Sequence, residues 1–254
     1  MTRFVTIGKT MNLRHMGGYP VADGRTTDAG KLFRSGFLHL ADEDGARRFD
    51  ELGIGTVYDF RSPAERTKNS LGLDEDVKVV ELGMLAASVE NLWDMLLAEG
   101  LTPAGAEKIM CERYRELTAE EIPGYRAMFQ HMLDDDGGVL VMCSFGKDRA
   151  GIASALLLTA LGVPEQVVLE DYLLSSIAYA DRDAAVKKFE QFFNSEGMAL
   201  DPAIVAPILD ARAQYLDTAW QVMREAAGSP DSFMEREFGL DQAAREFLAQ
   251  RFTR

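Results

Sequence analysis

The chain has 254 residues, of which 47% are hydrophobic and 27% are charged, and its formal net charge is -14 with a pI near 4.7. This length and composition are typical of a globular chain with a packed core that needs no disulfides. Polyanion binding requires a basic surface, so the acidic balance excludes nucleic acid or an anionic membrane as a bulk partner. Any phosphate site must therefore be a local basic island.

The sequence has no evident membrane or export signal. Residues 1–14 lack the apolar core and cleavage site of a standard signal peptide. The longest apolar run, residues 150–163, is too short to cross a bilayer. The two cysteines, Cys111 and Cys143, lie far apart, which fits reduced thiols in a cytoplasm better than a disulfide. We expect a cytoplasmic protein with no transmembrane segment, and secretion without a standard signal peptide stays open.

Strands and helices are expected to alternate after an irregular arm that covers residues 1–30. Short runs of β-forming residues predict strands at 32–34, 56–60, 77–82 and 139–142. Apolar spacing, caps and breaks predict helices over 42–52, from 62 onward, over 84–136 with breaks at 100–103 and 121–124, over 150–161, and over most of the remainder. This order is typical of an α/β fold with a mostly parallel sheet flanked by helices.

The most informative stretch joins the strand at 139–142 to the helix at 150–161. Between them lies a polar, glycine-containing loop that begins with Cys143 and ends six residues later with Arg149. Backbone amides converge where a loop enters a helix, and the helix dipole favours negative charge there. A guanidinium can hold two phosphate oxygens at once. The spacing therefore predicts an anion cradle in which a nucleophile and a clamp meet on one phosphate.

The chemistry expected of such a loop is nucleophilic. A free thiol with a pKa of about 8.5 is mostly protonated at neutral pH, and the loop amides, the helix N-terminus and Arg149 would all favour the thiolate of Cys143. In-line attack on phosphorus gives a phosphocysteine that water hydrolyses, with no metal or cofactor. The alternative, that Cys143 is only a small buried residue, is disfavoured by the loop around it. A nucleotide-binding P-loop is rejected because Met142 and Asp148 stand where it needs Gly and Ser or Thr.

Two further candidates follow the strand at 56–60. Asp59 and Arg61 come at its carboxyl end, where open α/β sheets place their ligands. The alternative is an ordinary surface ion pair. Cys111 lies in a helical run and is expected to serve packing.

The chain resembles the bacterial and fungal tyrosine phosphatase family with the Cys-x-x-x-Gly-Lys-Asp-Arg loop, whose members act on phosphotyrosine and phosphoinositides. The resemblance covers nearly the whole chain, and the order of its segments is more specific than any one of them. The segments that carry it are Asn12-Leu13-Arg14, Gly17 to Pro20, Phe33 to Gly36, Leu52 to Ile54, Asp59 to Glu65, the loop at Cys143, Asp171 to Ser175, Tyr215 to Asp217, and Phe238 to Leu240.

This resemblance implies the α/β sandwich of cysteine phosphatases, formed by a single domain over residues 1–254 with a helical lid at about 179–200. It implies Cys143 as nucleophile and Arg149 as phosphate clamp, with Asp148 as general acid and Asp59 as its rival or helper. Lys147 looks like the extra basic residue that lets relatives accept phosphoinositides. The full set of residues expected to bind the substrate or support the loop is Ser144, Phe145, Gly146, Lys147, Ala150, Arg61, Asn12 and Arg14.

Three positions depart from the family pattern. Met142 replaces the usual His, Ala150 replaces a Thr or Ser, and His15 replaces an Asp. In the family, the His and the hydroxyl normally tune and stabilise the thiolate as it attacks and leaves. Their absence leaves two hypotheses about the function. One is a phosphomonoesterase acting on phosphotyrosine, with phosphoserine or phosphoinositides as further substrates. The other is a low-activity pseudophosphatase that binds phosphorylated ligands. A rhodanese-like sulfurtransferase is a third reading, which the Gly-Lys-Asp-Arg sequence disfavours.

Overall fold

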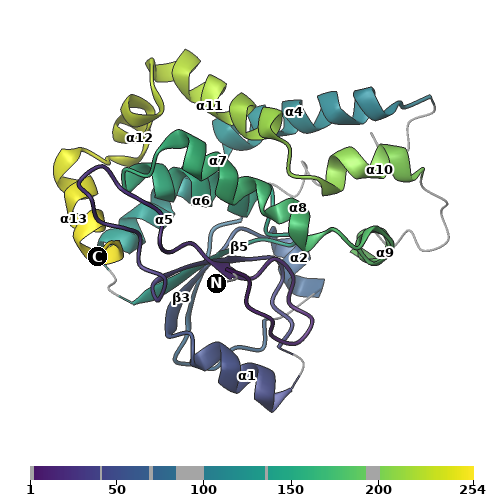
Figure 1. The fold of residues 1–254 in the computed structure, drawn as a ribbon, viewed down its shortest axis with the longest axis horizontal. Coiled ribbons are helices and arrows are strands. Elements are labelled where there is room, and N and C mark those ends of the chain that lie inside the picture. The colour runs from purple at the N-terminus through teal and green to yellow at the C-terminus, as the bar shows by residue number, and fades with distance from the viewer. Residues whose placement is uncertain (1–2, 41, 69–70, 84–99, 135–136, 193–200) are drawn as a thin grey trace.

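The computed structural model describes residues 3–40, 42–68, 71–83, 100–134, 137–192 and 201–254 (Figure 1). Within these residues five strands form one sheet in the order β1-β2-β5-β3-β4, and β1 alone runs antiparallel to its neighbour. The strands are β1 (Arg14–His15), β2 (Leu32–Ser35), β3 (Ile54–Asp59), β4 (Lys78–Glu81) and β5 (Gly138–Met142). The predicted mostly parallel α/β sheet is confirmed, and β1 is an extended piece within the predicted arm.

Helices occupy most of the chain outside the sheet. They are α1 (Glu43–Asp50), α2 (Pro63–Lys68), α4 (Pro103–Glu120), α5 (Ile122–Asp134), α6 (Arg149–Ala160), α7 (Glu165–Leu173), α8 (Ser175–Ala178), α9 (Arg182–Phe192), α10 (Pro202–Leu209), α11 (Ala213–Ala227), α12 (Pro230–Phe238) and α13 (Gln242–Phe252). The predicted break at 100–103 falls before α4, while the one at 121–124 is reduced to Glu121, because α5 already begins at Ile122. Residues 84–99 of the predicted helical stretch, and 193–200 of the predicted lid, lie outside the described residues.

The sheet is covered on both faces, which explains the unbroken apolar run of its central strand. In β5, Val139 and Val141 pack into the large core beneath the helices, while Leu140 and Met142 pack into a smaller core with Phe49 of α1. Figure 1 shows this arrangement, with α1 on one side of the sheet and α5, α6 and α7 on the other. A strand buried on both faces reads as continuously apolar rather than alternating.

A buried charge cluster joins the sheet to the helix layer. Asp171 of α7 accepts hydrogen bonds from Arg34 Nη1 at 2.9 Å, from Arg14 Nε at 3.2 Å and from the Tyr19 hydroxyl at 2.8 Å. Both arginines and the aspartate are inaccessible to solvent or nearly so. Burial alone would raise the pKa of Asp171, but the two guanidiniums and the hydrogen bonds outweigh it and lower that pKa to about 2. The carboxylate therefore stays ionised and links β1, β2 and α7.

Replacing Asp171 with Asn should destabilise the protein strongly, because it leaves two buried guanidiniums without a counter-charge. Breaking a buried pair in this way costs about 3–5 kcal/mol. An unfolded aspartate titrates near 3.9 and the folded one at about 2, so the carboxylate contributes stability above pH ~4 and loses it as pH falls toward 2.

Urea unfolding at pH 7 and at several values between pH 4 and 2 checks this expectation. The difference between wild type and Asp171→Asn should be large at pH 7 and should shrink through the acid range. Asp23→Asn, which removes an exposed partner of Arg25, is the matched control and should leave the urea midpoint nearly unchanged. Equal midpoints for wild type and Asp171→Asn at pH 7 would contradict the assignment.

Candidate active site

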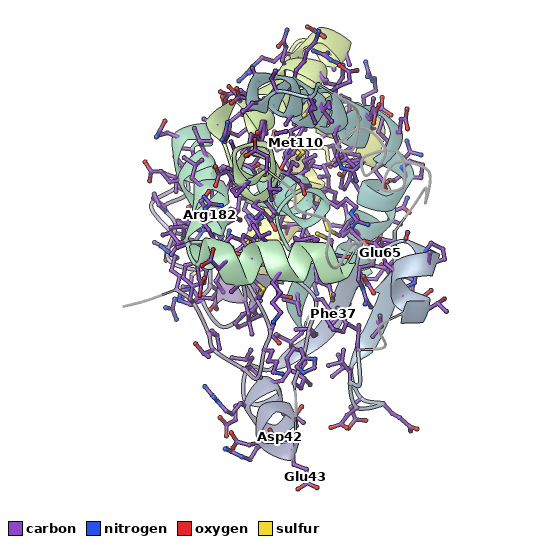
Figure 2. All side chains as sticks on the ribbon, turned by 90° about the vertical axis from the view of Figure 1, so that its right-hand side faces the viewer. Phe37, Asp42, Glu43, Glu65, Met110 and Arg182 are labelled. Carbon is purple, nitrogen blue, oxygen red and sulfur yellow. The ribbon has the colours of Figure 1, made fainter. Side chains whose placement is uncertain are left out.

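The loop from Cys143 to Arg149 lies at the carboxyl edge of the parallel strands. Strand register pairs Met142 at the end of β5 with Ser35 of β2 and with Asp59 of β3. The ends of three neighbouring strands therefore meet at the start of the loop, as the sequence predicted for Asp59 and Cys143. Figure 2 looks onto the right-hand side of Figure 1, with Phe37, which follows β2, and Glu65 of α2 both labelled on this side.

Gly146 allows the loop to turn tightly against β2. Its φ angle is +64°, in the left-handed region, and a Cβ there would lie 2.4 Å from the carbonyl oxygen of Ser35 and from the amide nitrogen of Gly36. The amide of Phe37 donates to the carbonyl of Ser144 at 3.0 Å and holds the first half of the loop on the same segment. Only glycine fits this conformation and this approach.

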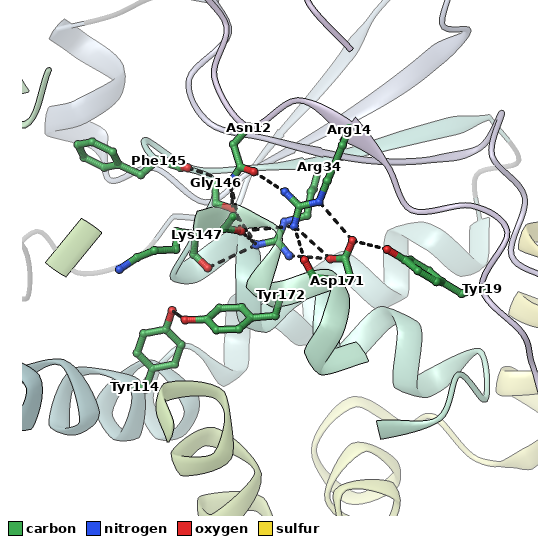
Figure 3. Close-up of polar contacts among 11 residues, drawn as sticks. Asn12, Arg14, Tyr19, Arg34, Tyr114, Phe145, Gly146, Lys147, Asp171 and Tyr172 are labelled. Carbon is green, nitrogen blue, oxygen red and sulfur yellow. Dashed lines mark hydrogen bonds and ion pairs between the residues drawn. The ribbon is translucent and has the colours of Figure 1, made fainter. Parts of the chain in front are cut away.

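Two buried side chains hold the loop from behind. Asn12 Nδ2 donates to the carbonyls of Gly146 at 2.9 Å and Phe145 at 3.3 Å, and Arg34 Nη2 donates to Gly146 at 2.7 Å (Figure 3). In a planar trans peptide the N–H points opposite to the C=O. The amides of Gly146 and Lys147 therefore point away from Asn12 and Arg34, the orientation that an anion cradle needs.

Arg14 is one layer further from the loop. Its guanidinium contacts Asn12, Asp171 and Ser175, and its burial lowers its pKa to about 10. Asn12 and Arg14 thus lie beneath the loop rather than at its open side, and their role as supports of the loop stays a prediction. Arg34 was not among the predicted site residues. Its signal was an arginine in the predicted strand at 32–34, within the segment Phe33 to Gly36 that carries the family resemblance.

Glu65 fixes the plane of the Arg149 guanidinium. Arg149 Nη1 lies 2.6 Å from Glu65 Oε2 and Nη2 lies 2.8 Å from Oε1, while Nη1 also donates to the Phe60 carbonyl at 2.9 Å. The hydroxyl of Ser144 donates to Glu65 Oε1 at 2.5 Å. Burial alone would raise the pKa of Glu65, but Arg149 and the hydrogen bonds to Glu65 lower it to about 2. The carboxylate stays ionised and connects α2 to both ends of the loop.

Glu65 is the second residue that the sequence prediction left out of the site. It follows Ser62 by three positions, and the two form a capping box. Ser62 N donates to Glu65 Oε2 at 2.6 Å and Glu65 N donates to Ser62 Oγ at 3.3 Å. The Ser-x-x-Glu pattern directly after a strand that ends at the site was a usable signal, because the cap places the carboxylate at the sheet edge.

Asp59 and Arg61 form a buried ion pair, not the surface pair considered as an alternative. Asp59 is fully buried and accepts from the Arg61 amide at 2.9 Å and from its Nη2 at 2.7 Å. Arg61 Nε lies 3.0 Å from each carboxylate oxygen, and the guanidinium lies 5.2 Å from the centroid of the Phe37 ring. The pair is positioned at the site edge with its carboxylate engaged by Arg61.

Asp148 is more open to solvent than Asp59. Its side chain is 20% exposed, and its Oδ1 lies 3.2 Å from the Lys147 ammonium. That ammonium also donates to the carbonyls of Ile208 and Asp210 at the end of α10. Burial lowers the pKa of Lys147. The Lys147 ammonium has three N–H groups and contacts three acceptors of the protein, so its side chain does not donate into the interior of the loop.

The segment after α7 contacts the loop directly. The Tyr179 hydroxyl donates to the carbonyl of Phe145, and the centroids of the two rings lie 6.1 Å apart. Helix α9 begins three residues later at Arg182, which pairs with Asp210. Figure 2 shows α9 crossing this side of the molecule, with the Arg182 label at one end and the Glu65 label at the other.

The family model described as the tyrosine phosphatase family matches residues 5–254. The chain belongs to the tyrosine phosphatase family. It is 33% identical over 237 residues to a Cupriavidus necator protein named "Putative tyrosine-protein phosphatase", an alignment that covers 91% of this chain and 83% of the relative. It is 30% identical over 257 residues to the triple specificity protein phosphatase PtpB of Mycobacterium tuberculosis, covering 88% of this chain and 91% of that protein.

Membership of the tyrosine phosphatase family confirms the class of enzyme predicted from the sequence. The chain is a phosphatase-type hydrolase whose substrates are phosphorylated, and the use of a cysteine nucleophile follows from the family. No helix among the described residues is both long and apolar enough to cross a membrane.

Replacing Glu65 with Gln should lower kcat/KM, and also the free energy of unfolding, because the buried Arg149 guanidinium loses its counter-charge. The substitution removes the charge that holds the guanidinium in plane, and a hydrogen bond to a charged group is worth about 1.5–3 kcal/mol. The expected loss is roughly tenfold to a hundredfold. Steady-state kinetics on an aryl phosphate, together with the inhibition constant of vanadate, measure it. Glu81→Gln, which loses only an exposed partner of Arg66, is the control, and unchanged vanadate inhibition in Glu65→Gln would contradict this role.

Proposed function

We propose that this tyrosine phosphatase hydrolyses phosphate monoesters in two steps at the loop from Cys143 to Arg149. In the first step the Cys143 thiolate attacks phosphorus, the S–P bond forms, the ester O–P bond breaks, and Asp148 gives its proton to the leaving oxygen. In the second step water attacks the phosphocysteine, Asp148 takes a proton from that water, and the S–P bond breaks. The products are the alcohol or phenol, inorganic phosphate and the restored thiolate.

The observation that carries this proposal is the support of the loop from behind. Asn12 and Arg34 engage the carbonyls of Phe145 and Gly146, so the following amides point the other way, toward a ligand held by the loop. A preorganised set of N–H donors stabilises the charge of a transferring phosphoryl group without reorganisation during the reaction. Arg149, held in plane by Glu65, supplies the second half of the clamp.

We place the first proton transfer on Asp148 rather than Asp59. Asp148 lies in the loop with a partly exposed carboxyl, while Asp59 is fully buried and accepts hydrogen bonds from Arg61. Asp59 then orients Arg61 beside the site. Loss of a general acid harms substrates with poor leaving groups more than activated aryl phosphates, so Asp148→Asn and Asp59→Asn distinguish the two residues.

The proposed main substrate is phosphotyrosine, with phosphoserine and phosphoinositides as further substrates. The printed name of one relative, a triple specificity phosphatase, supports a broad range. To bind a second phosphate of a phosphoinositide, Lys147 would have to leave the carbonyls of Ile208 and Asp210. Because breaking these two hydrogen bonds costs free energy, we expect monophosphorylated aromatic substrates to be preferred. The low-activity pseudophosphatase reading is not favoured, because the relatives are named as phosphatases.

Two broader expectations belong to this proposal. We take residues 1–254 as a single phosphatase domain, with residues 179–200 as a helical lid, and the contact between Tyr179 and Phe145 supports a lid role for the start of that segment. We also place the protein in the cytoplasm, which its two free cysteines, Cys111 and Cys143, support.

A panel of phosphopeptides, phosphoinositides and a small aryl phosphate tests the proposal, assayed with chelator and no added metal. Turnover of the phosphotyrosine peptide above the others is the expected result. A single burst of product equal to the enzyme concentration, followed by little turnover, would instead support the pseudophosphatase. Sulfur transfer to cyanide without phosphate release would support the sulfurtransferase.

Replacing Cys143 with Ser should abolish turnover but retain phosphate or vanadate binding, because the cradle of amides and Arg149 remains. Replacing Arg149 with Lys should weaken both, since a point charge cannot reproduce the two parallel hydrogen bonds of a guanidinium. Steady-state kinetics and vanadate titration separate the two effects. A serine variant that keeps more than about a tenth of the wild-type rate would rule out covalent catalysis by Cys143.

Replacing Ala150 with Ser should raise kcat. Ala150 is buried at the start of α6 and lacks the hydroxyl that could stabilise the departing thiolate in the second step. One such charge-assisted hydrogen bond is worth about 1.5–3 kcal/mol, which corresponds to roughly a tenfold to hundredfold effect. Rapid mixing should show a burst in the wild type, with its rate nearly unchanged in the variant. If kcat does not rise in Ala150→Ser, the missing hydroxyl does not limit this enzyme.

A further inference from the structure

Two buried tyrosine hydroxyl groups form a series of hydrogen bonds that ends on Asp148. The Tyr172 hydroxyl of α7 lies 2.6 Å from the Tyr114 hydroxyl of α4, which donates to Asp148 Oδ1 at 2.8 Å. Both tyrosines are buried, and their rings meet edge to face with centroids 6.1 Å apart. Figure 3 shows the two hydroxyl groups facing each other. Neither tyrosine was among the residues predicted from the sequence to form the site.

The direction of donation in this series of hydrogen bonds follows from the number of protons available. A phenol carries one proton. Because Tyr114 gives its proton to Asp148, it must accept the proton of Tyr172. Burial raises the pKa of both tyrosines well above the usual value, so both hydroxyls stay protonated and able to donate at neutral pH. Tyr172 therefore fixes the rotation of the Tyr114 hydroxyl toward the carboxylate.

The two carboxylate oxygens of Asp148 have different surroundings. Oδ1 accepts from Tyr114 and lies 3.2 Å from the Lys147 ammonium. Oδ2 accepts no hydrogen bond from any part of the chain that the structure describes. Two donors on Oδ1 disfavour a proton there, so a protonated Asp148 carries its proton on Oδ2.

Asp148 also differs from the other aspartates that precede helices. Asp42, Asp201 and Asp241 each accept a hydrogen bond from an amide of the helix that follows, as an N-cap aspartate ordinarily does. Asp148 occupies the N-cap position of α6, yet its side chain makes no such bond. The backbone of Asp148 is helical, with φ -83° and ψ -78°, whereas the backbones of the three capping aspartates are extended. Its side chain therefore does not cap α6 and is held by Tyr114 and Lys147 instead, which leaves the first amides of α6 available to another acceptor.

We propose that Tyr114, oriented by Tyr172, is a positioning residue that fixes the rotation of the Asp148 carboxyl and reserves Oδ2 for proton transfer to the leaving group. This inference rests on the proposed function, because it concerns the same general acid. It assigns a catalytic consequence to a residue of α4, a helix that contributes none of the loop residues. Without the Tyr114 hydroxyl, the Asp148 carboxyl keeps only its contact with Lys147 and can rotate, so that Oδ2 no longer has one fixed direction.

The test compares Tyr114→Phe, Tyr172→Phe and Tyr215→Phe on an alkyl phosphate and an activated aryl phosphate. Tyr215 is the matched control, since its ring packs 5.5 Å from that of Tyr114 while its hydroxyl donates to the Pro207 carbonyl. General acid catalysis is worth about 10²–10⁴-fold, so partial loss through misplacement should cost about tenfold more kcat/KM on the alkyl substrate than on the aryl one. Tyr172→Phe should show a smaller selective loss, and Tyr215→Phe an equal effect on both substrates.

Asp148→Asn separates failure of the inference from failure of the proposed function. If Asp148→Asn shows no leaving-group-selective loss, Asp148 is not the acid and the role of Tyr114 falls with it. If Asp148→Asn is selective but Tyr114→Phe affects both substrates equally, the inference alone is overturned. In the double variant, Tyr114→Phe should add no further selectivity to Asp148→Asn. Should Tyr114→Phe fail to fold, a selective loss in Tyr172→Phe supports the inference and an equal effect on both substrates overturns it.

Discussion

The geometry of the site depends on the neutralisation of buried positive charge by Asp171. Arg14 and Arg34 lie in the core, where an uncompensated guanidinium could not remain, and Asp171 is the carboxylate that both of them contact. Arg34 in turn holds the carbonyl of Gly146. Buried ion pairs contribute little net stability, but they fix a single arrangement of the groups around them. Here that arrangement is the orientation of the loop peptides.

The same construction is repeated for three cations of the candidate site. Arg149 is paired with Glu65, Arg61 with Asp59, and Lys147 with Asp148 and two carbonyl groups. A protein with a net charge of -14 can therefore contain a local cluster of basic residues in which these cations are paired with carboxylates or carbonyl groups. At physiological salt, charges more than about 8 Å away are largely screened. The electrostatic energy of an anionic ligand in the loop therefore depends mainly on these local groups and little on the acidic surface.

The sequence was sufficient for the parts of the site that are local in the chain. The strand, loop and helix around Cys143 and Arg149 follow from a pattern within one short segment, and the parallel strands place Asp59 at the same edge. Tyr114 was missed because it reaches the loop only through tertiary packing, whereas Glu65 and Arg34 each had a local signal that does not by itself say which partner the side chain meets. The contact of the Lys147 ammonium with the carbonyls of Ile208 and Asp210 was not predicted either. It depends on where α10 ends, which no periodicity in the sequence specifies.

Two residues of the loop, Cys143 and Lys147, depend on very different elements of the fold. Cys143 follows β5, which is paired on both edges and buried on both faces, and central strands of this kind are generally among the last parts of a fold to open. Lys147 is held by carbonyls at the end of α10, a short helix interrupted by Pro207. Local opening of α10 would therefore release the Lys147 side chain without disturbing the strand that carries the nucleophile.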